Sequence, residues 1–307
     1  MAKPSVAISI PTYNRANGYM RAALASAVAQ RYENLEIMVS DNASTDNTAE
    51  VVASFNDPRI RYVKHPQNIG PANNFRYCVE GVTSDYVLML HDDDLIDADF
   101  IETCMAALGD RTDVGMIRTG VRLIDGEGHL MEEFPNRARS TNAVEFMREW
   151  MTGTTALYLC CTLFHRQRLL DVGGFRSKKQ LFDDVVAEMK LAARYARVEV
   201  PDIKASYRRH GVNFGNSAKI RDWAEESLFL IDVMAEAAGS EAAAIRHEAL
   251  DYFCRKNYAY TARLASRWQR LQTYFLVDKM FHHHYPLWRF LYDRSVKGRW
   301  QRLLNRE

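Results

Sequence analysis

Strand-like and helix-like segments alternate regularly through the first 120 residues of the chain. Helical patterns begin near residues 19, 48, 73 and 98, and between them stand short apolar runs typical of strands, at residues 6–10, 35–40, 60–63, 86–90 and 114–118. This alternation predicts a series of βαβ units, and therefore a mostly parallel sheet with helices on both faces. Ligands of such sheets bind in the crevice beyond the carboxyl ends of the strands.

Polar turns follow four of the predicted strands at the point where each strand ends. They are the sequences PTYNR at residues 11–15, DNASTD at 41–46, HPQNIG at 65–70 and HDDD at 91–94. Because the carboxyl ends of parallel strands meet at one edge of a sheet, we expect the four turns to converge there. The sequence therefore predicts a polar site along this edge.

The last of these turns carries three consecutive aspartates, Asp92, Asp93 and Asp94, directly after an apolar run. Residues 86–90 are apolar on both faces, as in a strand buried within a parallel sheet. Carboxylates crowded at the end of such a strand repel one another, and a hard cation such as Mg²⁺ or Mn²⁺ relieves that repulsion. A solvated acidic loop that caps the helix beginning near Asp97 explains the same pattern, so both interpretations stay open.

The first two turns also have more than one explanation. Asp41 can accept hydrogen bonds from a nucleotide base or a ribose hydroxyl, whereas Asp46 is better explained as a helix cap. Thr12, Asn14 and Arg15 could contact a nucleotide and its phosphates, and the same residues also suit a tight turn.

The third turn and the missing motifs narrow the class of ligand. Asn68 and Gly70 fit loop shaping and ligand contact equally well. No G-x-G-x-x-G follows the first strand and no G-x-x-x-x-G-K-[ST] occurs anywhere, which argues against a dinucleotide oxidoreductase and a P-loop NTPase. Phosphates bound at this edge would be held mainly by metal.

Composition excludes several other classes of protein. The 307 residues are 47% hydrophobic and 26% charged, which is typical of a soluble globular chain with one large core or two smaller ones. A formal net charge of +1 gives no reason to expect a nucleic-acid partner. The five cysteines show no C-x-x-C spacing, so neither a disulfide framework nor a zinc site is expected. No segment has the length of a signal or membrane-spanning sequence, and a cytoplasmic location is expected.

Taken together, ISIPTYNR, VSDNASTDNT, NIG and LMLHDDD resemble, in this order and spacing, the family 2 glycosyltransferases with the GT-A fold. The resemblance covers roughly residues 5–215, and it continues with Gly173-Gly174-Phe175, Phe182-Asp183-Asp184 and Met189-Lys190-Leu191-Ala192, which are similar to the family's G-G-F…E-D…L-R-L-A segment. It implies an α/β fold of the Rossmann-like GT-A type in residues 1–215, with an acceptor region at about 120–215. It also implies metal-dependent, inverting transfer of a sugar from a nucleotide-sugar donor, most commonly a UDP-sugar.

The resemblance assigns roles to residues of the polar turns. Asp93 and Asp94 match metal ligands, with His210 as a third ligand from Tyr207-Arg208-Arg209-His210, which resembles the family's Y-R-x-H segment. The family's D-x-D pattern has an aspartate where this chain has His91, and Asp92 is expected at the ribose or at the water shell of the metal. Contacts to the nucleotide sugar are expected from Pro11, Thr12, Tyr13, Asn14, Arg15, Asp41, Asn68, Gly70, Asp92 and Arg208.

Asp183 and Asp184 are the expected catalytic residues. By similarity Asp184 is the base that takes the proton of the acceptor hydroxyl, and the adjacent charge of Asp183, which stands where the family has Glu, should raise its proton affinity. The pair also opens a helical pattern, so one of the two carboxylates can serve as a helix cap.

The rest of the chain has a different pattern. Residues 125–128 (DGEG) predict a hairpin turn, and residues 216–307 predict an appended helical subdomain. Between residues 279 and 307, seven Lys and Arg residues outnumber two acids and are interleaved with aromatic residues. This composition is typical of a helix that lies on an anionic membrane surface, and also of a solvated helix face.

The sequence therefore predicts a glycosyltransferase that acts on a glycan or lipid-linked acceptor in surface polysaccharide biosynthesis, in the cytoplasm or at the inner face of the membrane. A sugar nucleotidyltransferase is disfavoured because its glycine-rich first turn is absent. A non-catalytic nucleotide-sugar-binding or scaffold protein remains the alternative, although it would have no need for the Asp183-Asp184 pair.

Overall fold

The computed structural model describes residues 3–16, 18–210 and 218–294. The chain divides into two compact units, the first formed by Met1–Arg176 with Asp183–Asn213 and the second by Ser177–Phe182 with Phe214–Glu307. The sequence placed the boundary at residue 215 and had no signal for the short excursion of residues 177–182 into the second unit. No helix among the described residues combines the length and apolar character that crossing a bilayer requires.

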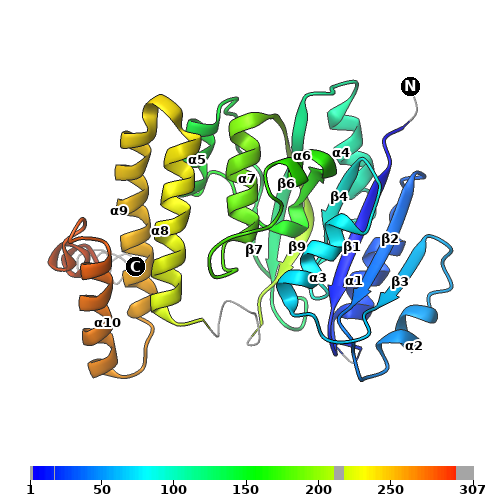
Figure 1. Ribbon diagram of the computed structural model, residues 1–307, viewed down its shortest axis with the longest axis horizontal. Coiled ribbons are helices and arrows are strands. Elements are labelled where there is room, and N and C mark those ends of the chain that lie inside the picture. Colours follow the sequence, from blue (N-terminus) through cyan, green and yellow to red (C-terminus); the bar gives the residue numbers. More distant parts are fainter. Residues whose placement is uncertain (1–2, 17, 211–217, 295–307) are drawn as a thin grey trace, which may run out of the picture. The chain divides into compact units, whose positions relative to one another are not determined.

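The first unit contains a nine-stranded mixed sheet in which β3, β2, β1, β4, β8, β6, β9 and β5 follow one another, with β7 paired to β6. Figure 1 shows β3, β2 and β1 side by side at one end of this sheet. Strands β1 to β4 are mutually parallel, as predicted. The bounds are β1 (Val6–Thr12), β2 (Leu35–Asp41), β3 (Ile60–Lys64), β4 (Tyr86–Met89), β5 (Leu95–Ile96), β6 (Val114–Ile124), β7 (Leu130–Phe134), β8 (Thr162–His165) and β9 (Ala196–Arg208).

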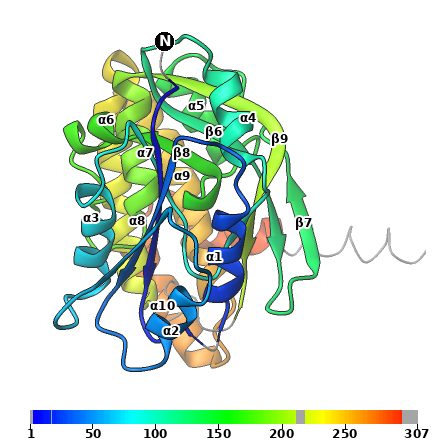
Figure 2. The ribbon, with the colours of Figure 1, turned by 90° about the vertical axis from the view of Figure 1, so that its right-hand side faces the viewer.

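Helices of the first unit cover both faces of the sheet. In Figure 2, α1 and α4 lie on one side and α3 and α6 on the other. The bounds are α1 (Met20–Val28), α2 (Thr48–Ala53), α3 (Pro71–Glu80), α4 (Phe100–Leu108), α5 (Ala143–Met151), α6 (Arg166–Asp171) and α7 (Asp183–Arg194), with a short 3₁₀ helix η1 (Leu159–Cys161). The apolar runs of β1, β2 and β4 are almost fully buried between these layers, which explains why they lack a polar face.

Two strands are much longer than their sequence patterns indicated. β6 was expected at residues 114–118 and β9 at 198–200, yet they pair in parallel until Ile124 lies opposite Arg208. The predicted turn at 125–128 joins β6 to β7 as an antiparallel hairpin. Gly120 permits the close approach of this hairpin, since a Cβ there would lie 2.8 Å from the carbonyl oxygen of Phe134.

The second unit is helical, as predicted for the C-terminal part of the chain. It contains α8 (Ile220–Ala237), the 3₁₀ turn η3 (Gly239–Glu241), α9 (Ala242–Thr261) and α10 (Arg267–Met280), and Figure 1 shows α8 beside α9. Phe182 packs against Trp223 and Phe253, which explains why residues 177–182 belong to this unit. Phe253, Cys254 and Tyr258 form the buried face of α9.

Candidate active site

The four polar turns converge on one edge of the sheet because β1 to β4 are parallel and in register. Thr12 at the end of β1 lies opposite Asp41 at the end of β2, and Asp41 lies opposite Lys64 at the end of β3. The loop after β4 reaches the same edge, where the hydroxyl of Thr12 donates a 2.7 Å hydrogen bond to Asp92 Oδ2. The predicted convergence is therefore confirmed.

Side chains connect the first three turns into one hydrogen-bonded edge. Asn14 receives a hydrogen bond from the Thr45 N–H at 2.8 Å and donates its own N–H to Ser44 Oγ at 2.8 Å. The Asn42 side-chain amide donates to Asn68 Oδ1 at 3.0 Å, and the same oxygen accepts the Gly70 N–H at 2.8 Å. These contacts fix the shape of the loops, and they leave Asn14 and Asn68 on the exposed surface of the edge.

Asp41 is fully buried, and its two carboxylate oxygens are already engaged. Oδ1 accepts the Ser44 N–H at 2.7 Å and Oδ2 accepts the phenol of Tyr62. In this arrangement Asp41 supports the loop after β2. Asp46 accepts the Thr48 N–H at 3.1 Å just before α2, but the N-cap position is Asn47, so Asp46 supports the start of the helix from one residue earlier than a cap.

The acidic turn lies beside the end of β9 because the short strand β5, which follows the turn, pairs with β9. Leu95 lies opposite Ser206, and this register places residues 208–210 against residues 93–94. The Arg208 N–H donates to Asp94 Oδ1 at 2.8 Å, and His210 Nε2 lies 2.8 Å from Asp93 Oδ2. Two motifs that are far apart in sequence thus form one cluster, as the resemblance implied.

The residues of this turn fit a divalent cation. His91, Asp93 and Asp94 each offer a ligand atom, and these atoms lie within 4.8 Å of one another. Asp94 Oδ2 is buried and accepts no hydrogen bond, with His91 Nδ1 3.7 Å away, so this oxygen lacks the partner that a cation would supply. From the sequence, His91 was only a departure from the family pattern and was not identified as a potential ligand. The predicted ligand His210 contacts Asp93.

The pKa values of the acidic turn also favour a cation site. Burial raises the pKa of Asp92 to about 6, and the neighbouring charge of Asp93 adds to the shift. Burial also raises the pKa of Asp94. For His91 burial lowers the pKa, but the nearby carboxylate of Asp94 and the charges of Asp93 and Asp92 outweigh it and raise the pKa to about 9. The turn therefore binds positive charge more readily than isolated aspartates would.

Arg208 fixes the backbone of the acidic turn through hydrogen bonds. Its buried guanidinium donates to the carbonyl oxygens of Asp93 at 2.9 Å, Asp125 at 3.1 Å and Gly126 at 3.3 Å. It also stacks 4.5 Å from the ring centroid of Tyr19, a residue that sequence reasoning had not identified. These contacts join the acidic turn to the β6–β7 hairpin, whereas the neighbouring Arg209 is exposed.

Asp183 and Asp184 begin α7, as predicted, and both are half-buried. Burial raises the pKa of Asp184 to about 6, with Asp183 shifting it in the same direction and the His91 charge opposing it. The influence of His91 shows that Asp184 lies within electrostatic reach of the acidic turn. A carboxylate with this pKa can accept a proton near neutral pH.

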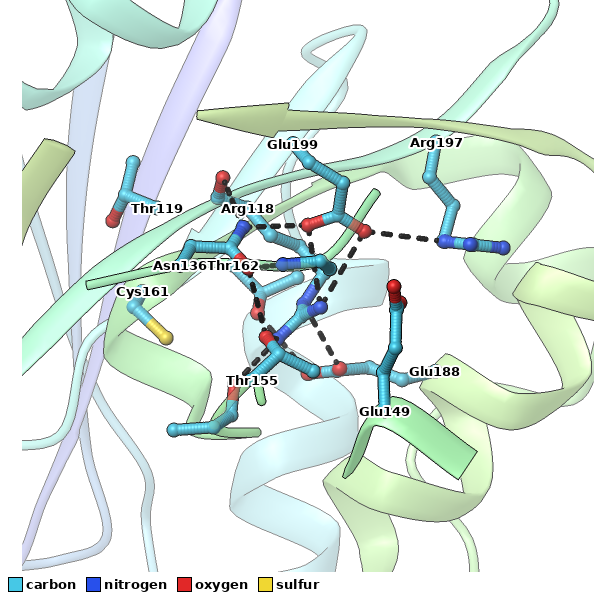
Figure 3. A network of polar contacts seen from close by, with 12 residues as sticks. Arg118, Thr119, Asn136, Glu149, Thr155, Cys161, Thr162, Glu188, Arg197 and Glu199 are labelled. Carbon is cyan, nitrogen blue, oxygen red and sulfur yellow. Dashed lines mark hydrogen bonds and ion pairs between the residues drawn. The ribbon is translucent and has the colours of Figure 1, made fainter. Parts of the chain in front are cut away.

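A buried ion-pair network anchors α7 to the sheet one turn beyond Asp184 (Figure 3). Arg118 on β6 is fully buried, and its Nε lies 3.3 Å from Glu188 Oε2, while its Nη1 lies 3.3 Å from Glu199 Oε2. Thr162 on β8 donates to Glu188 Oε1 at 3.0 Å. Sequence reasoning missed this network, although an arginine inside the apolar run of β6 was a signal for it.

The remaining predicted residues lie at the same edge. Tyr13 is exposed, and Pro11 and Arg15 are half-buried beside it. In the expected acceptor region, Trp150 is a core residue of α5, and Tyr158 stacks on Tyr207 with ring centroids 4.4 Å apart.

An acidic turn at the carboxyl edge of a mixed, helix-covered sheet is the architecture of the GT-A glycosyltransferases, and solved structures agree. TarS of S. aureus, residues 1–349 in complex with UDP-GlcNAc, superimposes with a TM-score of 0.61 over 91% of this chain and 92% of that chain, at 14% identity. The mannosyltransferase PcManGT of Pyrobaculum calidifontis, in complex with GDP-Man and Mn²⁺, gives a TM-score of 0.53 over 98% of this chain and 88% of that one, at 19% identity. At 14% and 19% sequence identity, the similarity to these two structures shows the fold alone.

The sequence places the chain within a family. The family model described as "Glycosyl transferase family 2" matches residues 7–173, and the chain belongs to this family. An uncharacterized glycosyltransferase of Rickettsia felis is 40% identical over 129 residues, which are 41% of this chain and 21% of the relative. The chondroitin synthase of Pasteurella multocida is 34% identical over 152 residues, 48% of this chain and 15% of the synthase. The chain thus matches about a fifth or less of the length of these relatives.

Proposed function

We propose that this protein transfers a sugar from a nucleoside diphosphate sugar to a hydroxyl group of a glycan or lipid-linked acceptor, with inversion at the anomeric carbon. A UDP-sugar is the donor we favour, since TarS binds UDP-GlcNAc, although PcManGT binds GDP-Man. One observation carries the proposal: His91, Asp93 and Asp94 hold ligand atoms within 4.8 Å of one another at the carboxyl edge of the sheet, where Asp94 Oδ2 is buried without a hydrogen bond. A charge-binding centre and a proton acceptor are the two parts that this reaction needs.

The edge of the sheet would bind the nucleotide. Tyr13, Asn14 and Asn68 are exposed along it and can contact the base, ribose and phosphates. Asp41 and Gly70 would act through the shape of their loops, because Asp41 is engaged with Ser44 and Tyr62. The network of hydrogen bonds between the turns preorganises this surface, which lowers the entropy cost of holding the donor in one geometry.

Asp93 and Asp94 would hold a divalent cation, Mg²⁺ or Mn²⁺, with His91 or His210 as a further ligand. When bound, such a cation neutralises the negative charge of a diphosphate leaving group. The hydrogen bonds around the turn hold the three carboxylates in fixed orientations. Thr12 orients Asp92, His210 orients Asp93 and the Arg208 N–H orients Asp94.

Asp184 would accept the proton of the acceptor hydroxyl. Attack from the side opposite the leaving group forms the new C1–O bond as the old one breaks, which inverts the configuration. A correctly placed base contributes typically about 10²–10⁴-fold to such a step. Asp183 would support this role by raising the proton affinity of its neighbour.

Nucleoside diphosphate release across a panel of UDP-, GDP- and dTDP-sugars, with and without Mn²⁺, tests the proposal. We expect slow release from one donor, lost in Asp93→Asn, and acceptor-dependent transfer lowered about 10²-fold or more in Asp184→Asn with donor binding intact. Asp202→Asn, an exposed carboxylate on β9, is the matched control. Tight nucleotide binding without turnover in any combination would overturn the proposal in favour of a non-catalytic scaffold protein.

We also propose that the second unit contacts an anionic membrane surface, which suits a lipid-linked acceptor in surface polysaccharide biosynthesis. The sequence indicated residues 279–307, of which 295–307 lie outside the described residues. Within the described part, α10 and the segment after it expose six large apolar side chains: Trp268, Leu271, Phe275, Trp288, Leu291 and Tyr292. Arg267 and Lys279 on α10 are exposed as well. Aromatic side chains mixed with basic ones are typical of helices that lie in the membrane interface.

A further inference from the structure

Three side chains with metal-binding atoms meet in the second unit, apart from the acidic turn. His247 and Asp251 are one helical turn apart on α9 and therefore face the same side. His284 belongs to the turn that follows α10, and its Nε2 lies 3.1 Å from Asp251 Oδ1. The rings of His247 and His284 are in edge contact, with centroids 4.7 Å apart and planes at 72°. One potential ligand atom from each residue lies within 4.8 Å of the others.

The His284 imidazole is poorly satisfied by the protein alone. Its Nε2 is buried and makes no hydrogen bond, and its 3.1 Å contact with Asp251 Oδ1 is an ion pair only when the ring is protonated. A buried polar atom without a partner costs about 1–3 kcal/mol, so its position calls for a further interaction. A cation shared between this nitrogen and the Asp251 oxygen would satisfy both.

The turn that carries His284 is held firmly against α9. His282 and His283 have φ values of 51° and 56°, in the left-handed region that residues other than glycine rarely adopt. Phe281 is fully buried, and the Tyr258 hydroxyl on α9 donates to the Tyr285 carbonyl oxygen at 3.2 Å. The surrounding packing thus imposes a strained turn that directs His284 toward His247 and Asp251.

We propose that His247, Asp251 and His284 bind a divalent transition metal, preferably zinc. The bound metal would link the turn after α10 to α9. Two imidazoles and one carboxylate suit zinc and other nitrogen-preferring metals, whereas the acidic turn of the first unit suits hard cations. In a tetrahedral zinc site with bonds of about 2.0–2.1 Å, ligand atoms lie about 3.3 Å apart. The Asp251–His284 pair already has this spacing, and the exposed His247 side chain closes the site by rotation.

Zinc titration of the full chain by calorimetry tests this proposal, with excess Mg²⁺ present so that the acidic turn does not compete. The variants are His247→Ala, Asp251→Asn and His284→Ala, and His282→Ala is the matched control because this exposed histidine belongs to the same turn. We expect one zinc equivalent to bind the wild type and the control, and to bind each ligand variant at least about 100-fold more weakly. Zinc should raise the melting temperature of the wild type and the control only.

Zinc binding of unchanged affinity in His247→Ala would overturn the proposal, and so would the absence of any zinc-dependent rise in the wild-type melting temperature. In either case the three residues form only an ion pair with a second histidine in edge contact. His247 is exposed, so its replacement should leave the fold intact and keeps the test decisive if His284→Ala does not fold. Cobalt substitution adds a second readout, because visible absorption bands appear when Co²⁺ occupies a tetrahedral site of this kind.

Discussion

The carboxyl groups of Asp92 and Asp184 come from different elements, yet their pKa values are raised to about 6 for the same main reason. Burial disfavours the charged form of each group, and a neighbouring aspartate adds to the effect. The two groups differ in their partners, since Asp92 accepts a hydrogen bond from Thr12 whereas Asp184 accepts one from its neighbour Val185. Similar pKa values can therefore belong to groups with different proposed tasks, contact with the ribose or the water shell of a cation for Asp92 and proton acceptance for Asp184.

The transfer rate should fall as the pH is lowered through about 6, because Asp184 accepts a proton only while it is ionised. Above this pH the rate should reach a plateau. The measurement is kcat against pH under saturating donor and acceptor, with Asp184→Glu compared with wild type. A rate that is constant between about pH 5 and pH 8 would contradict the assignment of Asp184 as the base.

Replacement of Asp94 by asparagine should separate the effect of the acidic turn on stability from its proposed role in binding a cation. Asparagine can still accept the Arg208 N–H, and it removes one of the repelling charges. Without metal, Asp94→Asn should therefore be as stable as the wild type or more stable. The rise in melting temperature that Mn²⁺ produces in the wild type should be lost. Thermal unfolding with and without Mn²⁺ measures both effects, and a full Mn²⁺ response in the variant would exclude Asp94 as a ligand.

At the scale of single elements, α7 depends on contacts made one turn after its functional residue. Asp184 and Glu188 are four residues apart, and Glu188 is fully buried against Arg118 of β6 and Thr162 of β8. Burial raises the pKa of Glu188 to about 8, while Arg118 lowers it. The helix that presents the proposed base is thus fastened to the sheet through a buried polar network, which fixes the distance between Asp184 and the acidic turn.

Loss of Arg118 should be strongly destabilising, because it leaves the fully buried carboxylate Glu188 without its cation and removes one of the two cations of Glu199. We expect Arg118→Ala to lower the free energy of unfolding by about 3–5 kcal/mol, mainly through Glu188, because Glu199 keeps Arg197 at 3.2 Å. Glu188→Gln, which keeps the acceptor for Thr162, should cost much less. Arg111→Ala is the matched control, because its ion pair with Asp113 is 45% and 63% exposed and should contribute at most about 1 kcal/mol. Urea unfolding of the three variants measures the order, and equal losses for Arg118→Ala and Arg111→Ala would contradict the anchoring role.

Local pattern predicted some elements of this fold and could not predict others. β1, β2 and β4 were predictable because strands buried on both faces read as continuous apolar runs. The second half of β9 was not, since Pro201, Asp202 and Lys204 break any apolar pattern and only pairing with β6 and β5 makes it a strand. The Arg118 network was missed because its partners Glu188 and Glu199 are distant in sequence, and no spacing within one segment indicates them. His91 lies within three residues of Asp93 and Asp94, and it was missed because the family pattern has an aspartate at its position.

Across the whole chain, the two units expose different kinds of surface. The first unit buries its apolar strands and presents polar turns at one edge, where open α/β sheets bind their ligands. The second presents large apolar side chains on α10 and the segment after it, with Trp268 66% and Phe275 60% exposed. Isolated exposed apolar residues are ordinary, but several within one helix and the segment that follows it indicate an interaction surface.

Binding to anionic lipid vesicles tests whether this surface contacts a membrane. Insertion of Trp268 and Phe275 into the interface removes apolar area from water, so the double variant Trp268→Ser with Phe275→Ser should weaken vesicle binding by at least about tenfold. Deletion of residues 285–307 should weaken it further, because each basic residue near the surface contributes about 1 kcal/mol. Co-sedimentation with vesicles of phosphatidylserine and phosphatidylcholine, at low and high salt, measures both contributions.

The matched control for this surface is the double variant Leu130→Ser with Met131→Ser on β7, because these side chains are 58% and 53% exposed in the first unit. General loss of apolar surface would affect both double variants equally, whereas membrane contact through α10 affects only the first. Raised salt should weaken wild-type binding, since the attraction between basic side chains and lipid headgroups is screened. Neutral vesicles that bind the wild type as tightly as anionic ones would remove the electrostatic part of the proposal. If the α10 double variant and the β7 double variant bind vesicles equally, the exposed apolar side chains of α10 do not contact the membrane. These side chains would then contact another partner.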